Sequence, residues 1–145
     1  VFTKKRRSAT VNESIGLTLT KDMTIGRGNI LCTGLSAMQR PKHFQGNIFW
    51  LSPKELMQGQ AVKLQCSTQT FNCLVTKIVT AIDPADLMIL EKDVATLKEN
   101  QAALIEFTIL TSAVLEKHSE IPELGRYTIE DDHELLGAGT VLSIT

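Results

Sequence analysis

The fold is decided by two runs near the end of the chain, Arg126-Tyr127-Thr128-Ile129-Glu130-Asp131 and Thr140-Val141-Leu142-Ser143-Ile144. In the first run polar and apolar side chains alternate, which is the pattern of a β-strand with one buried face. A polar turn follows, and Gly137-Ala138-Gly139 leads into the second run. The pattern predicts a β-hairpin that closes the chain.

The preceding residues repeat this alternation in short segments separated by turns. Glycine and proline mark several turns, such as Met57-Gln58-Gly59-Gln60 and Asp83-Pro84. Residues 93–99 fit either a short helical turn or an irregular loop. Strand-like runs at intervals of about ten residues are typical of an all-β sandwich or barrel. The expected strands are residues 14–19, 28–32, 44–51, 61–66, 71–79 and 100–110.

The composition is that of a globular domain with ordinary charge. The chain has 145 residues, of which 43% are hydrophobic and 21% are charged, enough for one domain with a core. Its net charge of −1 argues against nonspecific nucleic-acid binding, because proteins with that role usually have a clear basic excess. One basic cluster, Lys4-Lys5-Arg6-Arg7, is able to contact phosphate, but a solvated loop or edge strand explains it more simply.

The cysteines and the ends of the chain indicate its surroundings. Cys32, Cys66 and Cys73 form neither an even set nor a Cys-x-x-Cys pair, which argues against a disulfide framework and a structural zinc site. A reducing, cytoplasmic location is therefore expected. No run reaches the roughly 18 apolar residues of a membrane span, and no signal-peptide pattern opens the chain. Because the chain starts at Val1 within a strand-like run, we expect a fragment of a longer protein.

The motifs that usually carry catalysis or hold cofactors are missing from the sequence. There is no GxxxxGK[ST] phosphate loop, and neither Gly26-Arg27-Gly28 nor Gly137-Ala138-Gly139 opens a helix. Gly26-Arg27-Gly28 is only a turn, and Gly137 and Gly139 are better explained by a β-bulge or by close backbone packing. The three histidines share no metal-ligand spacing, and the acidic run at residues 130–132 lies at a hairpin tip. We predict no catalytic, cofactor-binding or metal-binding residue in this stretch.

The aromatic side chains are spread over the expected strands. Trp50 is the only tryptophan and follows Phe49, so alternation places the two side chains on opposite faces of one strand. A surface that stacks on single-stranded nucleic acid needs exposed aromatic side chains beside basic ones, and packing in a barrel core is the simpler explanation. One of the two must still face outward, which makes the pair a candidate for a domain interface.

Several motifs, taken in order, resemble one protein family. Residues 42–51 resemble the opening strand of the third domain of elongation factor Tu-like GTPases. Leu124-Gly125-Arg126-Tyr127-Thr128-Ile129, followed by residues 137–141, is similar to the family's GRF-type strand and its terminal Gly-x-Gly strand. Upstream, residues 14–19 and 25–31 are similar to the end of the family's second domain.

This resemblance implies an all-β fold in two parts. Residues 43–145 would form an antiparallel six-stranded Greek-key barrel of the elongation factor Tu domain 3 type, preceded by a linker at residues 36–42. Residues 1–35 would supply strands of a partial second barrel. The family binds GTP and magnesium on an N-terminal domain that this stretch lacks. The expected first partner is therefore the GTPase domain of the same parent chain.

Within the family, the leading hypothesis is a sulfate-activating parent, and two alternatives stay open. Ile48-Phe49-Trp50-Leu51 looks most like the GTPase subunit of sulfate adenylyltransferase, which implies a parent that forms adenylyl sulfate beside an adenylyltransferase subunit. Residues 122–129 are equally similar to translation elongation and termination factors, whose barrels bind tRNA or a protein partner. A stand-alone β-barrel binding module is a third alternative. Nucleic acid is expected as a partner only in the translational case, and a membrane in none.

The resemblance also suggests where partners would touch the barrel. The candidate contact residues are Trp50, Arg126 and the basic cluster of Lys4, Lys5, Arg6 and Arg7. For Arg126, a structural role in pairing with a carboxylate on a neighbouring strand is an equally consistent hypothesis.

Overall fold

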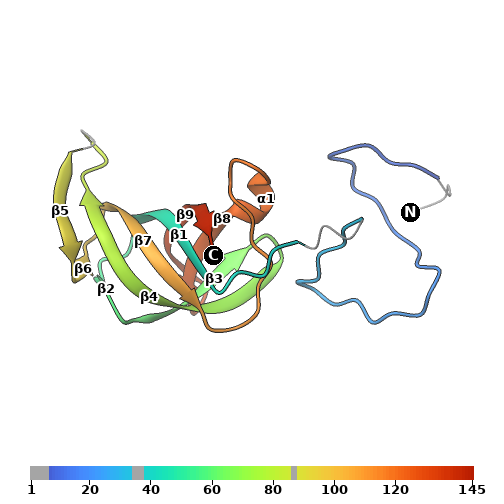
Figure 1. Cartoon of the computed structure of the whole chain (residues 1–145), viewed down its shortest axis with the longest axis horizontal. Coiled ribbons are helices and arrows are strands. Elements are labelled where there is room, and N and C mark those ends of the chain that lie inside the picture. Colours follow the sequence, from blue (N-terminus) through green and yellow to red (C-terminus); the bar gives the residue numbers. More distant parts are fainter. Residues whose placement is uncertain (1–6, 34–37, 86–87) are drawn as a thin grey trace.

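The computed structural model describes residues 7–33, 38–85 and 88–145, and it places one β-barrel after residue 42 (Figure 1). The strands follow the alternating runs of the sequence, because a strand directs successive side chains to opposite faces. The elements are β1 (His43–Trp50), β2 (Leu56–Met57), β3 (Ala61–Cys66), β4 (Gln69–Ile82), β5 (Ile89–Val94), β6 (Thr96–Leu97), β7 (Ala102–Ile109), α1 (Pro122–Gly125), β8 (Arg126–Asp131) and β9 (Glu134–Ile144).

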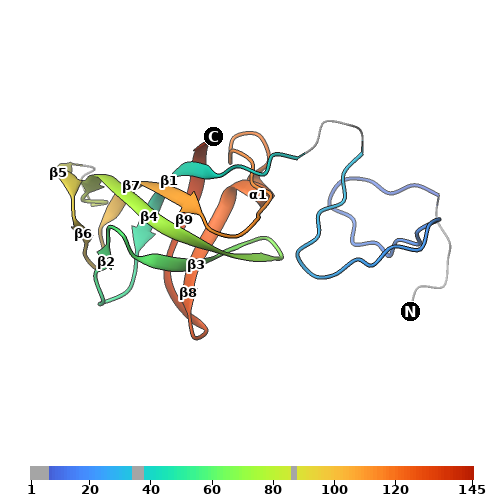
Figure 2. The same cartoon turned by 60° about the horizontal axis from the view of Figure 1, so that its bottom comes forward.

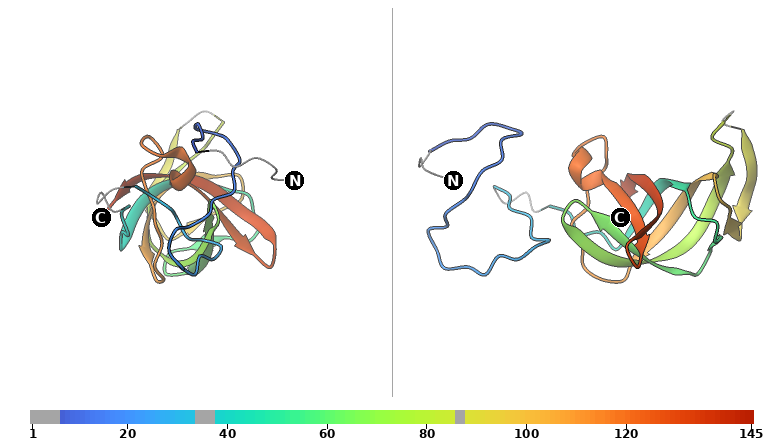
Figure 3. Two further views of the ribbon diagram at one scale, coloured as in Figure 1. Left: turned by 90° about the vertical axis from the view of Figure 1, so that its right-hand side faces the viewer. Right: turned by 180° about the vertical axis from the view of Figure 1, so that it is seen from behind.

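Within the described residues, six strands close into a ring in which all neighbours are antiparallel. The order is β3, β8, β9, β1, β7 and β4, and a further pairing of β4 with β3 completes the ring. Seen end-on, the strands surround a common interior (Figure 3, left). β5 joins the distal part of β4 outside the ring, and β2 pairs with β6 in a separate small sheet. The predicted all-β, six-stranded antiparallel barrel is confirmed.

The barrel interior is filled by the inward-facing side chains of the ring strands. On β1, Phe44, Ile48 and Trp50 are all buried. Phe44 stacks on Phe107 with ring centroids 4.8 Å apart, and Tyr127 meets both rings edge-on. Stacked and edge-to-face contacts add to the stabilisation that comes from burying apolar area. The aromatic cluster thereby joins β1, β7 and β8 through the core.

Tyr127 also joins three strands through its hydroxyl group. The hydroxyl of this β8 residue donates a 2.8 Å hydrogen bond to the main-chain carbonyl of Asn47 on β1, and β9 lies between the two strands. A Cβ on Gly46 or on Gly139 would lie 2.7 Å from that hydroxyl, and one on Gly139 would also overlap the Asn47 carbonyl oxygen. Burial raises the pKa of Tyr127, so the hydroxyl stays a donor. The explanation of Gly137-Ala138-Gly139 by close backbone packing is confirmed.

The segment before β1 is bonded to the barrel. The Gln39 amide donates to the carboxylate of buried Glu116 at 3.3 Å, and the Leu115 amide donates to the Gln39 carbonyl at 3.2 Å. The buried Gln69 side chain makes two bonds, of 2.9 and 2.8 Å, to the main chain of Val114. Hydrogen bonds to side chains, and not to a neighbouring strand, thus satisfy these main-chain groups of the loop between β7 and α1. The loop in turn holds Gln39, while Lys42 is bonded to Thr145 and to Ile109 of β7.

Residues 7–33 do not form the strands expected of a partial second barrel. The described residues contain no strand at 14–19 or 28–32. Ile15, Leu17 and Leu19, the apolar face of the first predicted strand, are 47%, 64% and 40% exposed. A strand needs a paired neighbour and a covered apolar face, and this part of the described chain supplies neither. The assignment of residues 1–35 to a second domain stays a prediction.

The region expected to be a helical turn or loop, residues 93–99, contributes to two strands instead. β5 ends at Val94, and β6 places Leu97 opposite Leu56 of β2, with both leucines fully buried. Asp93 has a φ of +52°, which interrupts the regular strand geometry near the end of β5. Periodicity failed for β6 because this two-residue strand is held by β2, a partner about forty residues earlier in the sequence.

Replacing Gly139 by alanine is expected to lower the free energy of unfolding by about 1–3 kcal/mol, the usual cost of overpacking a filled core. The added methyl group has no space between Asn47 and Tyr127. Urea denaturation followed by the fluorescence of Trp50 measures the change. Gly16→Ala is the matched control, since no atom lies within 4 Å of its added Cβ. Equal stability of the two variants would contradict the packing explanation.

Native thiol reactivity is expected to separate the three cysteines. Burial raises the pKa of the Cys66 thiol to about 11 and that of the Cys73 thiol to about 12, whereas Cys32 is exposed. Because the thiolate is the reactive form, the buried pair should resist a disulfide reagent at pH 8. We expect one fast-reacting thiol in the native chain and all three after unfolding. Fast reaction of Cys66 or Cys73 in the native protein would show that the pairing of β3 with β4 opens readily.

Candidate functional site

Trp50 lies in the core and not on the surface. Its side chain is 1% exposed, and its indole nitrogen donates a 2.7 Å hydrogen bond to the Lys54 carbonyl. Phe49, on the opposite face of β1, is the half-buried residue of the pair that faces outward. The expectation that Trp50 contacts a partner is corrected accordingly, because a fully packed indole presents no surface to one.

The predicted basic cluster lies almost entirely outside the described residues. Lys4, Lys5 and Arg6 belong to the part of the chain that is not described, whereas Arg7 is described and exposed. The role of this cluster in a contact stays a prediction.

Arg126 is exposed on the outer face of the barrel. It begins β8 directly after the single helical turn α1, and it points away from the core because the next residue, Tyr127, points inward. Its Nε donates a 3.3 Å hydrogen bond to the Pro122 carbonyl. Among the described residues Arg126 makes no ion pair, so the structure does not support the alternative of a carboxylate partner on a neighbouring strand. The guanidinium is available to a ligand or a partner.

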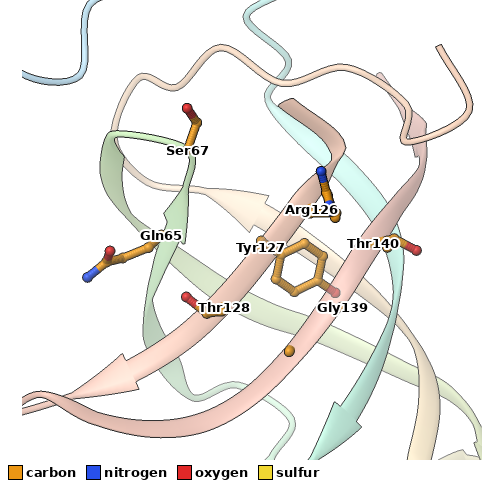
Figure 4. A pocket seen from close by; sticks show the side chains of 8 residues that line it. Gln65, Ser67, Arg126, Tyr127, Thr128, Gly139 and Thr140 are labelled. Carbon is orange, nitrogen blue, oxygen red and sulfur yellow. The ribbon is translucent and has the colours of Figure 1, made fainter. Parts of the chain in front are cut away.

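A shallow depression of about 500 Å³ lies beside Arg126 (Figure 4). It opens where β3 and β8 part, because these strands pair at two positions only, Leu64 with Ile129 and Gln65 with Thr128. The hairpin of β8 and β9 then continues past the ring strands to its turn (Figure 2). The residues that line the depression are Gln65, Ser67, Arg126, Tyr127, Thr128, Ala138, Gly139 and Thr140.

Hydrogen bonds set the polarity of this surface. Glu130 accepts a 2.6 Å bond from the Gln65 side-chain nitrogen and a 3.0 Å bond from the Thr128 hydroxyl. The Asn47 side-chain oxygen accepts a 2.7 Å bond from the Thr140 hydroxyl and a 2.9 Å bond from the Thr140 amide. Both threonine hydroxyls therefore donate within the barrel, and each oxygen keeps the capacity to accept a further hydrogen bond. Arg126 is the charged donor of this surface.

The depression is suited to binding another molecule, and the residues that line it do not form a catalytic arrangement. In the described ranges no three His, Cys, Asp or Glu side chains gather in a group able to hold a metal ion. The histidines lie apart: His43 contacts Thr108 at 3.1 Å, His118 lies before α1, and His133 lies in the turn between β8 and β9. No described helix has the length and apolar character needed to cross a membrane.

Charge divides the chain into two unlike parts. Residues 43–145 contain seven Lys and Arg against fourteen Asp and Glu, a formal charge of −7, whereas residues 1–42 contain eight against two, a formal charge of +6. Arg126 is the only arginine after residue 42. An acidic barrel repels the phosphate backbone of nucleic acid. The outer surface of the barrel is therefore better suited to a protein partner.

Sequence reasoning found Arg126 but missed the rest of the depression. Alternation along residues 126–131 did signal that Thr128 shares the outer face with Arg126. Gln65 and Thr140 come from other strands, and a period of two does not reveal which strands are neighbours. No signal in the sequence marks the short pairing of β3 with β8 that opens the depression.

Comparisons with known proteins place the barrel among its relatives. A family model described as GTP-eEF1A C-terminal domain-like matches residues 43–142. Elongation factor 1-alpha of Hyperthermus butylicus is 29% identical over 104 residues, which are 71% of this chain and 24% of that protein. Elongation factor 1-alpha of Methanothrix thermoacetophila is 31% identical over 105 residues, which are 72% of this chain and 25% of that protein.

A solved structure shares the fold. The structure of Sup35 complexed with GDP matches with a TM-score of 0.69 and 16% identity, over 77% of this chain and 27% of that one. The chain spans about a quarter of the length of the curated relatives it matches. The family model covers the barrel from the start of β1 into β9. This chain therefore belongs to the GTP-eEF1A C-terminal domain-like family.

Proposed function

We propose that this chain supplies the C-terminal barrel domain of a translation-type GTPase, an elongation or termination factor, and serves it through non-catalytic contacts. The observation that carries the proposal is the family match over residues 43–142, whose named relatives are elongation factors. In this proposal GTP and magnesium bind to another domain of the parent chain, and the parent works in the cytoplasm.

The depression beside Arg126 is the surface we assign to the GTPase domain of the parent chain. Arg126 makes no ion pair within the described barrel, and a guanidinium forms strong paired hydrogen bonds with a carboxylate. The hydroxyl oxygens of Thr128 and Thr140 add acceptors for donors that flank such a carboxylate. The formal charge of −7 on residues 43–145 favours a protein over tRNA as the direct partner of the barrel.

A sulfate-activating parent is the second candidate. It is supported by the resemblance of Ile48-Phe49-Trp50-Leu51 to the GTPase subunit of sulfate adenylyltransferase. Ile48 and Trp50 are 2% and 1% exposed, so half of this run reflects core packing and carries little information about a partner. The named relatives are translation factors, which favours the first candidate. A stand-alone module is disfavoured by relatives about four times as long as the matched stretch.

Nucleotide binding is expected in the parent chain and not in residues 1–145. Titration of a fluorescent GTP analogue into the 145-residue chain should give no saturable signal. The full parent should bind the analogue and should hydrolyse GTP faster when ribosomes are added. Saturable binding by the 145-residue chain would contradict the proposal. GTP-dependent formation of adenylyl sulfate by the parent would favour the second candidate instead.

Arg126→Ala is expected to weaken docking of the GTPase domain about tenfold, since a hydrogen bond to a charged group contributes about 1.5–3 kcal/mol. Isothermal titration of the separately produced GTPase domain into residues 1–145 measures the affinity. The unfolding temperature should not change, because the side chain is exposed. Lys98→Ala removes another exposed cation, away from the depression, and is the matched control. Equal losses in both variants would leave only a general charge effect and rule out the Arg126 contact.

A further inference from the structure

A row of apolar side chains crosses four neighbouring strands of the barrel. Phe49 of β1 lies opposite Ala102 of β7, Ala102 lies opposite Ile82 of β4, and Ile82 lies opposite Ile89 of β5. Residues directly opposite each other in an antiparallel pair direct their side chains to the same face. Phe49, Ala102, Ile82 and Ile89 therefore form one continuous line, here termed the apolar row.

The apolar row faces outward. Phe49 lies between two buried residues of β1, and Ala102 and Ile82 each lie beside a buried alanine. Phe49, Ala102 and Ile82 are half-buried, and Ile89 is 57% exposed. The neighbouring row on the same face is largely polar. Its members are Asn47, Leu104, Thr80 and Lys92.

The row ends at a free sheet edge. In the described sheet β5 pairs with β4 alone and lies outside the closed ring, at the end of the barrel away from residues 7–33 (Figure 1; Figure 3, right). Leu90 on the same strand is 49% exposed. An unpaired edge offers main-chain donors and acceptors to an added strand, and apolar side chains beside it offer the pockets for that strand's alternate residues.

Charge decides among the molecules that could occupy this edge. In the sequence, residues 83–94 contain four acidic residues and one lysine, and the described strand β5 carries two of these acidic residues. One of the acidic residues, Asp93, is held by Lys77 of β4 at 2.7 Å. Pairing two copies of β5 would bring two such acidic segments together, and nucleic acid would be repelled as well. A basic strand is attracted.

We propose that the free edge of β5 together with the apolar row is a docking face for a partner protein, which adds an extended strand that alternates apolar residues with lysine or arginine. Around the ring, β7 lies three strands from β8 in either direction, so this face points away from the depression beside Arg126. The barrel can then hold a GTPase domain on one side and a second protein on the other.

The backbone limits the length of the added strand. Asp93 has a φ of +52°, which breaks the regular strand geometry before Val94. A register shift against β4 between Glu91 and Ile89 adds a second irregularity, so an added strand can pair only with a short part of residues 89–92 and gains few hydrogen bonds. Specificity then depends on the apolar side chains that lie over Ile89 and Ile82. Substituting Ile89 tests that dependence directly.

Chemical-shift titration of the isotope-labelled chain, residues 1–145, tests the proposal. The probe is a capped seven-residue peptide that alternates valine with lysine and arginine. Amide shifts should change along β5 and the adjoining end of β4. Ile89→Lys should weaken binding about tenfold or more. Leu142→Lys, at a leucine of β9 that is 46% exposed, should bind like the unmodified chain. A peptide with glutamate in place of the basic residues should bind about tenfold more weakly.

Three results would overturn the proposal. One is the absence of shifts along β5, and another is unchanged affinity in Ile89→Lys when its spectrum and unfolding temperature show a native fold. The third is a dimer in analytical ultracentrifugation that Ile89→Lys returns to a monomer, which would assign the edge to a second copy of the chain. None of these results bears on nucleotide binding by the parent, so the proposed function is tested separately.

Discussion

The barrel depends on close packing where β8, β9 and β1 meet. There the hydroxyl group of Tyr127 occupies space that side chains at positions 46 and 139 would otherwise fill. Tyr127 reaches past β9 to the Asn47 carbonyl, and it can do so because residues 46 and 139 are glycines. Any larger residue at Gly139 would meet the carbonyl oxygen itself. The close approach of these strands brings Tyr127 against Phe44 and Phe107, which begins the packing of the core.

The architecture also depends on β4, because the two halves of this strand pair with different neighbours. The first half of this strand pairs with β3 and closes the ring, and the second half carries β5 outside it. Register shifts along β4 in its pairing with β7 change its direction between the two tasks. Gln69 at its start also holds the long loop through the main chain of Val114. One strand thus determines the closure of the barrel, the position of its loop and the presence of its free edge.

The alternation of polar and apolar residues predicted individual strands, but it did not predict which strands are neighbours. The runs at residues 44–51, 61–66, 71–79 and 126–131 are strands because each has an apolar face that the barrel covers. Residues 14–19 have the same alternation but no covering layer, and they form no strand. Trp50 could be assigned to a face of its strand only once the inside of the barrel was known. The depression beside Arg126 arises from the divergence of two strands, a property of their pairing that no single run of residues contains.

The short pairing of β3 with β8 has a mechanical consequence. A closed ring is as strong as its weakest junction, and here one junction has two residue pairs whereas that between β1 and β7 has seven. Breaking it costs few hydrogen bonds and leaves every other junction intact. The ring then becomes an open six-stranded sheet with β8 at one edge and β3 at the other. A molecule bound in the depression that contacts both β3 and β8 would hold these strands together. Binding at this surface and the rigidity of the whole barrel are therefore physically linked.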